Sequence, residues 1–209
     1  MYNCALCSVV ACIDENPECL PKNCPMNREA LLEEGFLEYE KDENRKFHSK
    51  STEIEADGYC QWPRIREIIE FSKGMNYKKI GMAFCLGLHK EAKIVDKLLR
   101  EAGFETVSVI CKTGGFPKER IGILDEKKVR PGNFETICNP VGQAKLLNEQ
   151  HTDFNIVVGL CVGHDSMFYK YSEAMVTTLI AKDRVLAHNP AGALYCSEGY
   201  FKDKVSDRK

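Results

Sequence analysis

The residues of this chain that are most able to do chemistry are its cysteines. There are 11 of them among 209 residues, and five crowd the N-terminus, at positions 4, 7, 12, 19 and 24. A short segment this rich in thiols, with few large apolar residues, cannot form its own core and needs disulfides or a metal ion to hold it. An odd number of cysteines in a reducing compartment does not make a disulfide framework, which leaves metal binding and thiol chemistry.

We predict that four of the N-terminal cysteines bind a metal. Cys4, Cys7, Cys12 and Cys24 follow the spacing C-x2-C-x4-C-x11-C, and the C-x2-C pair lets one turn present two adjacent sulfurs. Cys19 lies in an acidic, proline-flanked loop and is the one left over. Four thiolates suit either a tetrahedral zinc ion or an iron–sulfur cluster, and the spacing does not choose between them.

A second set of cysteines is defined by the predicted strands. Cys85, Cys111 and Cys161 each follow an apolar strand, and Cys138 precedes a predicted helix. Sites in parallel sheets lie beyond the carboxyl ends of the strands, so all four could share one edge. We expect Cys85, Cys138 and Cys161 to bind a cofactor, such as a second iron–sulfur cluster, or to be reactive thiols. The alternative is that they pack as small buried residues, and for Cys111 we favour this interpretation.

His164 follows Cys161 closely enough to act on the same ligand, as a base, a metal ligand or a hydrogen-bond partner. We take these two residues as the candidate catalytic residues, whereas Asp165 is better explained as the acidic start of a helix. Polar residues after the fourth strand could line the same pocket: Thr177, Thr178, Asp183, Arg184, His188 and Asn189. The segment Lys112-Thr113-Gly114-Gly115-Phe116 could close over a ligand, but it lacks the spacing of a phosphate or dinucleotide loop.

The elements that position these residues follow a strand–helix alternation. Continuous apolar strands are predicted at 80–84, 106–110, 155–160 and 176–181, with helices between them. This pattern predicts an α/β, Rossmann-like fold: an open parallel sheet of about four strands flanked by helices. The predicted parts are a cysteine-rich metal-binding module at 1–27, a helical connector packing on the body at 28–76 and the α/β domain at 77–209. Within the connector, Asn27 and Pro63 are expected to start helices, as N-cap and as first residue, and the polar run 41–55 is either exposed helix or connector.

Composition excludes several classes of function. The net charge is −2, with 29 basic and 31 acidic residues interspersed, and supplies no basic surface for nucleic acid. No apolar run approaches the roughly 20 residues that cross a bilayer, and the first residues lack a secretory signal. We therefore expect a cytoplasmic protein whose partner is a small-molecule substrate or a redox protein. A second copy of the chain could cover a cluster at the sheet edge, giving a homo-oligomer.

Several motifs resemble those of a family of uncharacterised, predicted metal-binding bacterial proteins. They are Cys4-Ala5-Leu6-Cys7, Asn23-Cys24-Pro25-Met26, Cys138-Asn139-Pro140, Gly159 to Asp165, Asp183-Arg184-Val185 and His188-Asn189-Pro190. The resemblance covers nearly the whole chain, and that family joins a cysteine-rich N-terminus to an α/β body. It implies metal at Cys4, Cys7, Cys12 and Cys24 and a common purpose for Cys85, Cys138 and Cys161. It implies neither which metal nor an activity.

Two functional hypotheses remain. In the first, both cysteine sets hold iron–sulfur clusters and the protein is a small redox or sulfur-handling enzyme, such as a reductase, with its substrate site at the sheet edge. In the second, a structural zinc module is joined to a non-catalytic domain that binds or senses a small molecule. The number and kind of metal ions per chain would distinguish these hypotheses.

Overall fold

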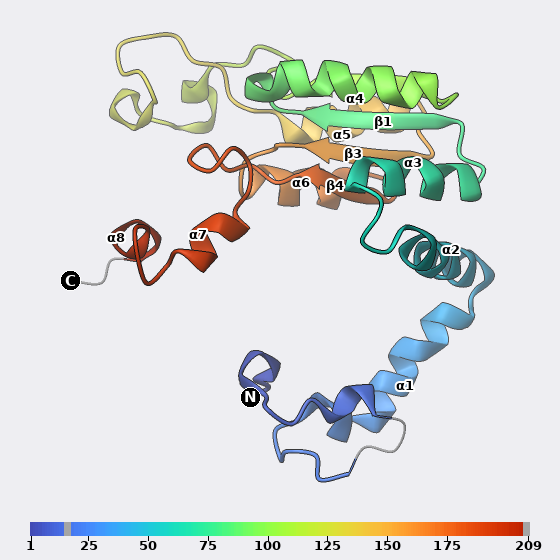
Figure 1. Cartoon of the computed structure of the whole chain (residues 1–209). Helices are drawn as coiled ribbons and strands as arrows, with labels where there is room; N and C mark the ends of the chain where they lie inside the picture. The colour runs from blue at the N-terminus through green and yellow to red at the C-terminus, as the bar shows by residue number, and fades with distance from the viewer. Residues whose placement is uncertain (15–17, 207–209) are drawn as a thin grey trace. The chain divides into compact units, whose positions relative to one another are not determined.

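The structure, a computed structural model, describes residues 1–14 and 18–206 (Figure 1). Residues 15–17 and 207–209, which fall in the predicted segments 1–27 and 77–209, lie outside the described residues. The chain divides into two compact units, Met1–Asp57 and Gly58–Lys209. In the described part of the chain, no helix combines the length and the apolar character needed to cross a membrane.

The first unit is built from helices and turns. Short 3-10 helices lie at Cys4–Leu6, Ala11–Ile13, Pro25–Asn27 and Glu38–Glu40, and the α-helices are α1 (Glu29–Leu37) and α2 (Asp42–Gly58). Asn27 does not cap α1, because its side-chain amide donates to the Pro21 carbonyl instead (3.0 Å) and Arg28 is the N-cap residue. The polar run 41–55, for which the sequence allowed either helix or connector, lies almost wholly in helix α2. Asp42 and Glu43 are in the first turn of α2, where acidic side chains stabilise a helix.

The second unit contains a parallel sheet. Its strands are β1 (Lys79–Phe84), β2 (Glu105–Ile110), β3 (Phe154–Val158) and β4 (Val176–Ile180), and they pair in the order β2-β1-β3-β4. The two central strands β1 and β3 are almost wholly buried, which explains their continuous apolar sequences. The predicted α/β class with an open parallel sheet is confirmed.

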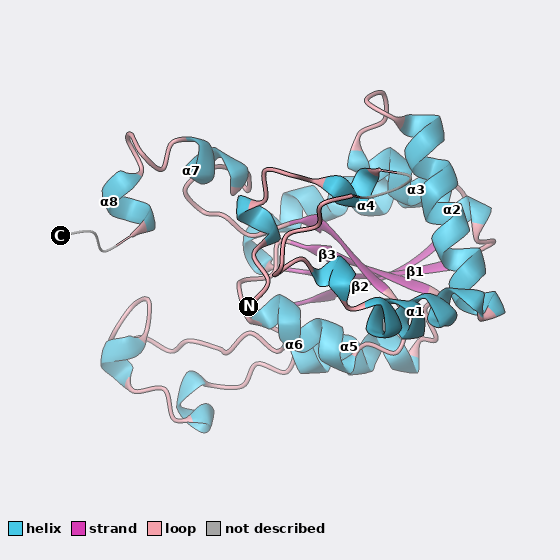
Figure 2. Cartoon of the chain, turned by 90° about the horizontal axis from the view of Figure 1, so that it is seen from below, coloured by secondary structure: helices cyan, strands magenta, loops and turns pink. Residues whose placement is uncertain are grey.

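Helices cover both faces of this sheet (Figure 2). Helices α3 (Arg64–Gly74) and α4 (His89–Glu101) lie on one face, and α5 (Pro140–Glu149) and α6 (His164–Tyr171) lie on the other. Two short helices, α7 (Ala191–Tyr195) and α8 (Lys202–Val205), come after β4 in the chain. Short 3-10 helices lie at Leu86–Leu88, Lys118–Ile121 and Asp125–Lys127. Because the chain leaves the neighbouring strands β1 and β3 towards opposite faces, the carboxyl ends of these strands form a switch point, where such folds bind ligands.

Two helices of the second unit begin at or next to the residues that the sequence predicts: α5 begins where expected, and α3 begins one residue later. Asn139 caps α5, since its Oδ1 accepts a hydrogen bond from the Gly142 amide (2.9 Å), and Pro140 is the first helical residue, as predicted. Pro63, expected as the first residue of α3, is instead its N-cap. The following Arg64 donates from Nε to the Thr178 carbonyl (2.7 Å), which ties α3 to the outer strand β4.

A buried amide stabilises the centre of the sheet. Asn155, on β3, is fully buried. Its Oδ1 accepts from the Thr152 hydroxyl and its Nδ2 donates to the Ser172 hydroxyl, both at 2.8 Å. On β1, Gly81 makes room for this side chain, because a Cβ atom at Gly81 would lie 1.9 Å from Asn155 Oδ1.

We expect Gly81→Ala to lower the free energy of unfolding by about 2 to 4 kcal/mol, through overpacking and loss of the Asn155 hydrogen bonds. Urea denaturation followed by circular dichroism measures the change. Gly199→Ala is the matched control, since the nearest atom to its added Cβ is 3.8 Å away. Equal stability of the two variants would contradict the steric role assigned to Gly81.

Candidate functional site

Four cysteines gather at the carboxyl edge of the sheet. The Cys85 amide donates to the last residue of β3 (3.1 Å) and the Cys111 amide donates to the last residue of β1 (2.9 Å), so the parallel ladder continues one step beyond the strands. The Asn139 amide donates to the Cys111 carbonyl (2.7 Å), which fixes the neighbouring Cys138 beside the end of β2. The edge predicted from the sequence therefore brings these thiols together.

Cys111 lies at the centre of the group. Its side chain is 2% exposed, and its Sγ accepts a hydrogen bond from the Leu86 amide (3.3 Å). Its thiol is hydrogen-bonded to both Cys138 and Cys85, and these two bonds, followed by burial, raise the pKa of Cys111. Cys111 is thus a neutral thiol at physiological pH, and its one proton can be donated to either of its two neighbours.

Cys138 is a thiolate at neutral pH. The hydrogen bond from Cys111 is the largest cause that lowers the pKa of Cys138, to about 5, while burial acts in the opposite direction. The positive charges of Lys112 and His164 lower this pKa further. Positive groups and hydrogen bonds stabilise the charged form of a thiol, so Cys138 carries the character of a reactive or metal-binding cysteine.

Cys85 has a similar environment on the other side of Cys111. Its pKa is lowered to about 5 by the Cys111 hydrogen bond first, then by the Gly87 backbone amide and by Lys182, against the effect of burial. A Cβ atom at Gly87 would lie 3.3 Å from Lys182 Nζ and 3.9 Å from Cys85 Sγ, so the glycine leaves space for the ammonium group to approach. Because Cys111 has one S–H proton, it donates to one of its two neighbours at a time.

Cys161, the third predicted cofactor ligand, has its own cation. Arg184 Nη2 donates to Cys161 Sγ (3.0 Å). The pKa of Arg184 is raised chiefly by Cys161 and further by the charges of Cys85 and Cys138. This guanidinium is therefore within electrostatic reach of all three thiols, and each of the three has a positive group beside it.

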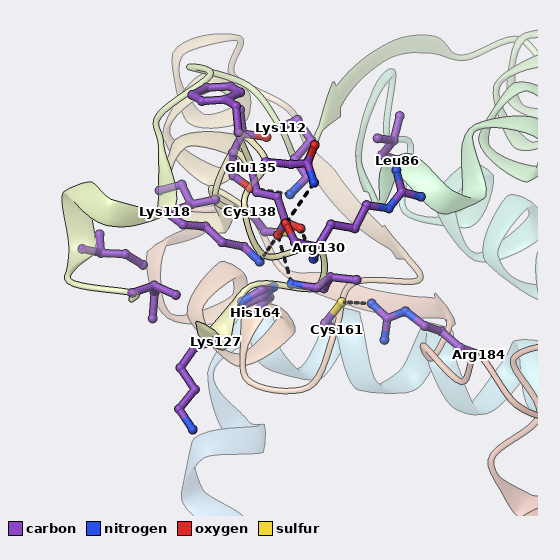
Figure 3. A pocket seen from close by; sticks show the side chains of 17 residues that line it. Leu86, Lys112, Lys118, Lys127, Arg130, Glu135, Cys138, Cys161, His164 and Arg184 are labelled. Carbon is purple, nitrogen blue, oxygen red and sulfur yellow. Dashed lines mark hydrogen bonds and ion pairs between the residues drawn. The ribbon is translucent and has the colours of Figure 1, made fainter. Parts of the chain in front are cut away.

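A cavity of about 840 Å³ opens next to these thiols (Figure 3). Cys138, Cys161, His164 and Arg184 line one side of it, whereas Cys85 is not among the lining residues. The other walls come mainly from the loop between β2 and α5: Lys112, Lys118, Ile121, Ile123, Lys127, Val129, Arg130, Asn133, Phe134, Glu135, Thr136 and Ile137. A cavity of this size accommodates a small organic molecule.

Internal ion pairs hold this loop in place. Lys118 pairs with Glu135, and the same carboxylate accepts a hydrogen bond from the Arg130 amide (2.7 Å). The Lys128 side chain is 5% exposed and pairs with Asp125 (2.8 Å). Most of the loop between β2 and α5 is thus a folded wall of the cavity, and of the segment 112–116, which was expected to close over a ligand, Lys112 lines it.

The predicted edge residues differ in whether they line the cavity. Cys138, Cys161 and His164 line the cavity, whereas Cys85 does not line it and joins the thiol group through its hydrogen bond with Cys111. The expectation that Cys111 is buried holds, but its hydrogen bonds to two thiols were missed; its strand-end position was the available signal. Asp165 accepts a hydrogen bond from the Ser166 amide (2.8 Å), within its own helix.

The polar residues in and after β4 have mostly structural contacts. The Asp183 carboxylate accepts hydrogen bonds from the Val185 and Leu186 amides (2.8 and 2.9 Å), and His188 Nδ1 accepts one from the Asp183 amide (3.1 Å). Of the six residues considered there, Arg184 lines the cavity. The sequence assigns Lys112 and Lys182 no place beside the thiols, because their distance from the thiols depends on how the loops fold.

The N-terminal cysteines lie in the first unit. Cys4, Cys7 and Cys24 line a shared hollow of about 240 Å³, and Cys12 is not among its lining residues. The Cys7 sulfur accepts a hydrogen bond from the Val10 amide (3.5 Å). Within residues 1–14 and 18–206, no three His, Cys, Asp or Glu side chains are grouped so as to hold one metal ion, at this hollow or at the sheet edge. Metal binding by Cys4, Cys7, Cys12 and Cys24 stays a prediction.

The low pKa of Cys138 predicts its reactivity. In reduced protein treated with a chelator, we expect the rate of its alkylation by iodoacetamide to change less than about threefold between pH 6.5 and 9, whereas an ordinary thiol accelerates about 50-fold or more. Mass spectrometry of quenched samples measures the rate at this residue. Cys111→Ala removes the main hydrogen-bond donor and should restore the pH dependence. A wild-type rate that rises as steeply as that of free cysteine would contradict this assignment.

Comparison with known proteins places the chain among relatives whose function is unknown. The family described as "Protein of unknown function (DUF1847)" matches residues 24–179, a segment that includes Cys24 and the edge cysteines but not Cys4, Cys7 or Cys12. The uncharacterized protein MJ0455 of Methanocaldococcus jannaschii is 47% identical over 195 residues, which cover 92% of this chain and 98% of that protein. This relative is archaeal, so the expectation of a bacterial family is not supported. The chain belongs to the DUF1847 family.

Proposed function

We propose that the protein is a small redox or sulfur-handling enzyme that binds metal through cysteine, as iron–sulfur clusters, and whose reacting site is the carboxyl edge of the sheet. The observation that carries this proposal is the group of three edge thiols, Cys85, Cys138 and Cys161, each with its own cation, of which Cys85 and Cys138 are hydrogen-bonded to the buried thiol of Cys111. A cavity suited to a small substrate adjoins them.

The charges at the edge suit an anionic cofactor. Thiolate ligands make an iron–sulfur centre negative, and nearby positive groups and hydrogen bonds to the sulfurs tune its reduction potential. Lys182, Lys112 and Arg184 supply positive charge beside Cys85, Cys138 and Cys161 respectively. Cations that only neutralised an isolated surface thiol would not need to converge from two different loops, one after β2 and one after β4.

Cys111 has a distinct role in this proposal. It stays protonated and donates a hydrogen bond to a ligand sulfur, which is one of the interactions that adjust cluster potential. Three protein ligands instead of four would leave one iron free to take a substrate group. Cys85 and Cys138 flank Cys111, which is hydrogen-bonded to both.

The N-terminal cysteines would form the second centre. Cys4, Cys7 and Cys24 already share one hollow, and Cys12 would complete a four-thiolate set. With a cluster there, this centre would deliver single electrons to the edge site. We propose a cytoplasmic location, a small-molecule or redox-protein partner and, for an exposed cluster, a homo-oligomer.

The alternative is a structural zinc module joined to a domain that binds or senses a small molecule. The large cavity favours this alternative, because it needs no metal to bind a ligand. In that case the edge thiols would be buried or redox-responsive, without catalysis.

Anaerobic purification, followed by visible spectroscopy and assay of iron, zinc and acid-labile sulfide, tests the proposal. We expect brown protein with several irons per chain. The double variant Cys85→Ser, Cys138→Ser should lose the iron bound at the sheet edge. The double variant Cys4→Ser, Cys7→Ser should lose the iron bound by the N-terminal cysteines.

Cys196→Ser is the matched control, because Cys196 is exposed and belongs to neither cysteine set. It should leave the iron content unchanged. Colourless protein with one zinc per chain, unaffected by the edge substitutions, would overturn the iron–sulfur proposal and support the alternative.

A further inference from the structure

The cavity beside the edge thiols has strongly positive walls. Five Lys or Arg side chains line it: Lys112, Lys118, Lys127, Arg130 and Arg184. The negative groups among its lining residues are the Glu135 carboxylate, which Lys118 neutralises, and the Cys138 thiolate, which lies beside Lys112. The surrounding protein as a whole carries a net charge of only −2, so this concentration of cations is a local feature of the cavity.

The cations differ in where they point. Figure 3 shows Arg130 extending from the loop across the cavity towards Leu86, whereas Lys127 points away from the thiols. Lys112 Nζ donates to the Thr136 carbonyl (2.7 Å) and lies close enough to Cys138 to act on its charge. In the described structure no hydrogen bond or ion pair is recorded for the side chain of Arg130.

Arg184 forms a second positive centre, on a different element. It follows β4, whereas Lys112 and Arg130 follow β2, and it uses one terminal nitrogen for Cys161. A guanidinium has five N–H donors, so the same group can bind a thiol and an acidic oxygen together. The cavity thus presents two positive centres with the edge thiols beside them.

We infer that this cavity binds a small organic dianion, with one acidic group bound by Arg130 and the other by Arg184. The inference rests on the proposed function in taking the edge thiols as the reacting groups, and it names the class of substrate that they meet. Guanidinium groups match carboxylate and phosphate oxygens in geometry as well as charge. The volume of about 840 Å³ exceeds what an inorganic oxyanion fills and suits a molecule with a carbon skeleton.

Isothermal titration of the protein as purified, with three probes, tests this inference. Succinate carries two carboxylates, phosphoglycolate carries a phosphate and a carboxylate, and succinamide is the neutral analogue of succinate. We expect the two dianions to bind and succinamide not to bind. Affinity should fall as salt rises from 20 to 200 mM, because screening weakens charge attraction at the open side of the cavity. Whichever dianion binds more tightly identifies the preferred acidic group.

Variants separate a specific site from general attraction. Arg130→Gln should weaken dianion binding by about tenfold or more, because it removes charge-assisted hydrogen bonds. Lys127→Gln removes the same charge from the same loop, but from a side chain that points away, and should change the affinity less than about threefold. Equal binding of succinamide and succinate, or equal effects of the two substitutions, would overturn the inference.

The metal assays keep this result independent of the proposed function. Colourless protein that binds dianions through Arg130 would remove the iron–sulfur proposal and leave the anion site standing. Brown protein that binds neither dianion would retain the cluster and remove the anion site. Iron content should be the same in Arg130→Gln and wild type, because this residue contacts substrate and not the cofactor.

Discussion

The parallel pairing of β1 with β2 and β3 is the constraint on which the candidate site depends. The backbone ladder runs past the strands, so the amides of Cys85 and Cys111 bond to the ends of β3 and β1 (3.1 and 2.9 Å). All carboxyl ends in a parallel sheet face one edge. Residues separated by tens of positions, such as Cys85 and Cys161, therefore share one site, and a change in register would disperse them.

Around this edge, charge and burial are combined in a way that a packed core would not require. Burial alone would keep the thiols neutral, since it disfavours the charged form. The Cys111 hydrogen bond and the cations beside Cys85 and Cys138 outweigh burial and lower the pKa of both to about 5. Cys111 itself moves in the opposite direction and stays a neutral donor. The neutral thiol of Cys111 thus lies between the ionised thiols of Cys85 and Cys138 and is hydrogen-bonded with both.

The two sets of cysteines lie in different units, the N-terminal set in Met1–Asp57 and the edge set in Gly58–Lys209. The family match begins at residue 24 and includes the whole edge group, while Cys4, Cys7 and Cys12 precede it. The α/β body carries both the edge thiols and the cavity. The N-terminal unit contributes thiols around a small hollow and suits a cofactor more than a substrate.

The sequence by itself determined the strands, the parallel α/β class and the strand-end positions of Cys85, Cys111 and Cys161, because buried strands require continuous apolar runs and the residue after each run is read directly. It also located the Asn139 cap, a local interaction. Only the tertiary structure decided that Cys111 bonds to two thiols and that Lys112, Lys182 and Arg184 reach the edge. Loop folding brings these groups together across long sequence separations, and no local pattern records such distances.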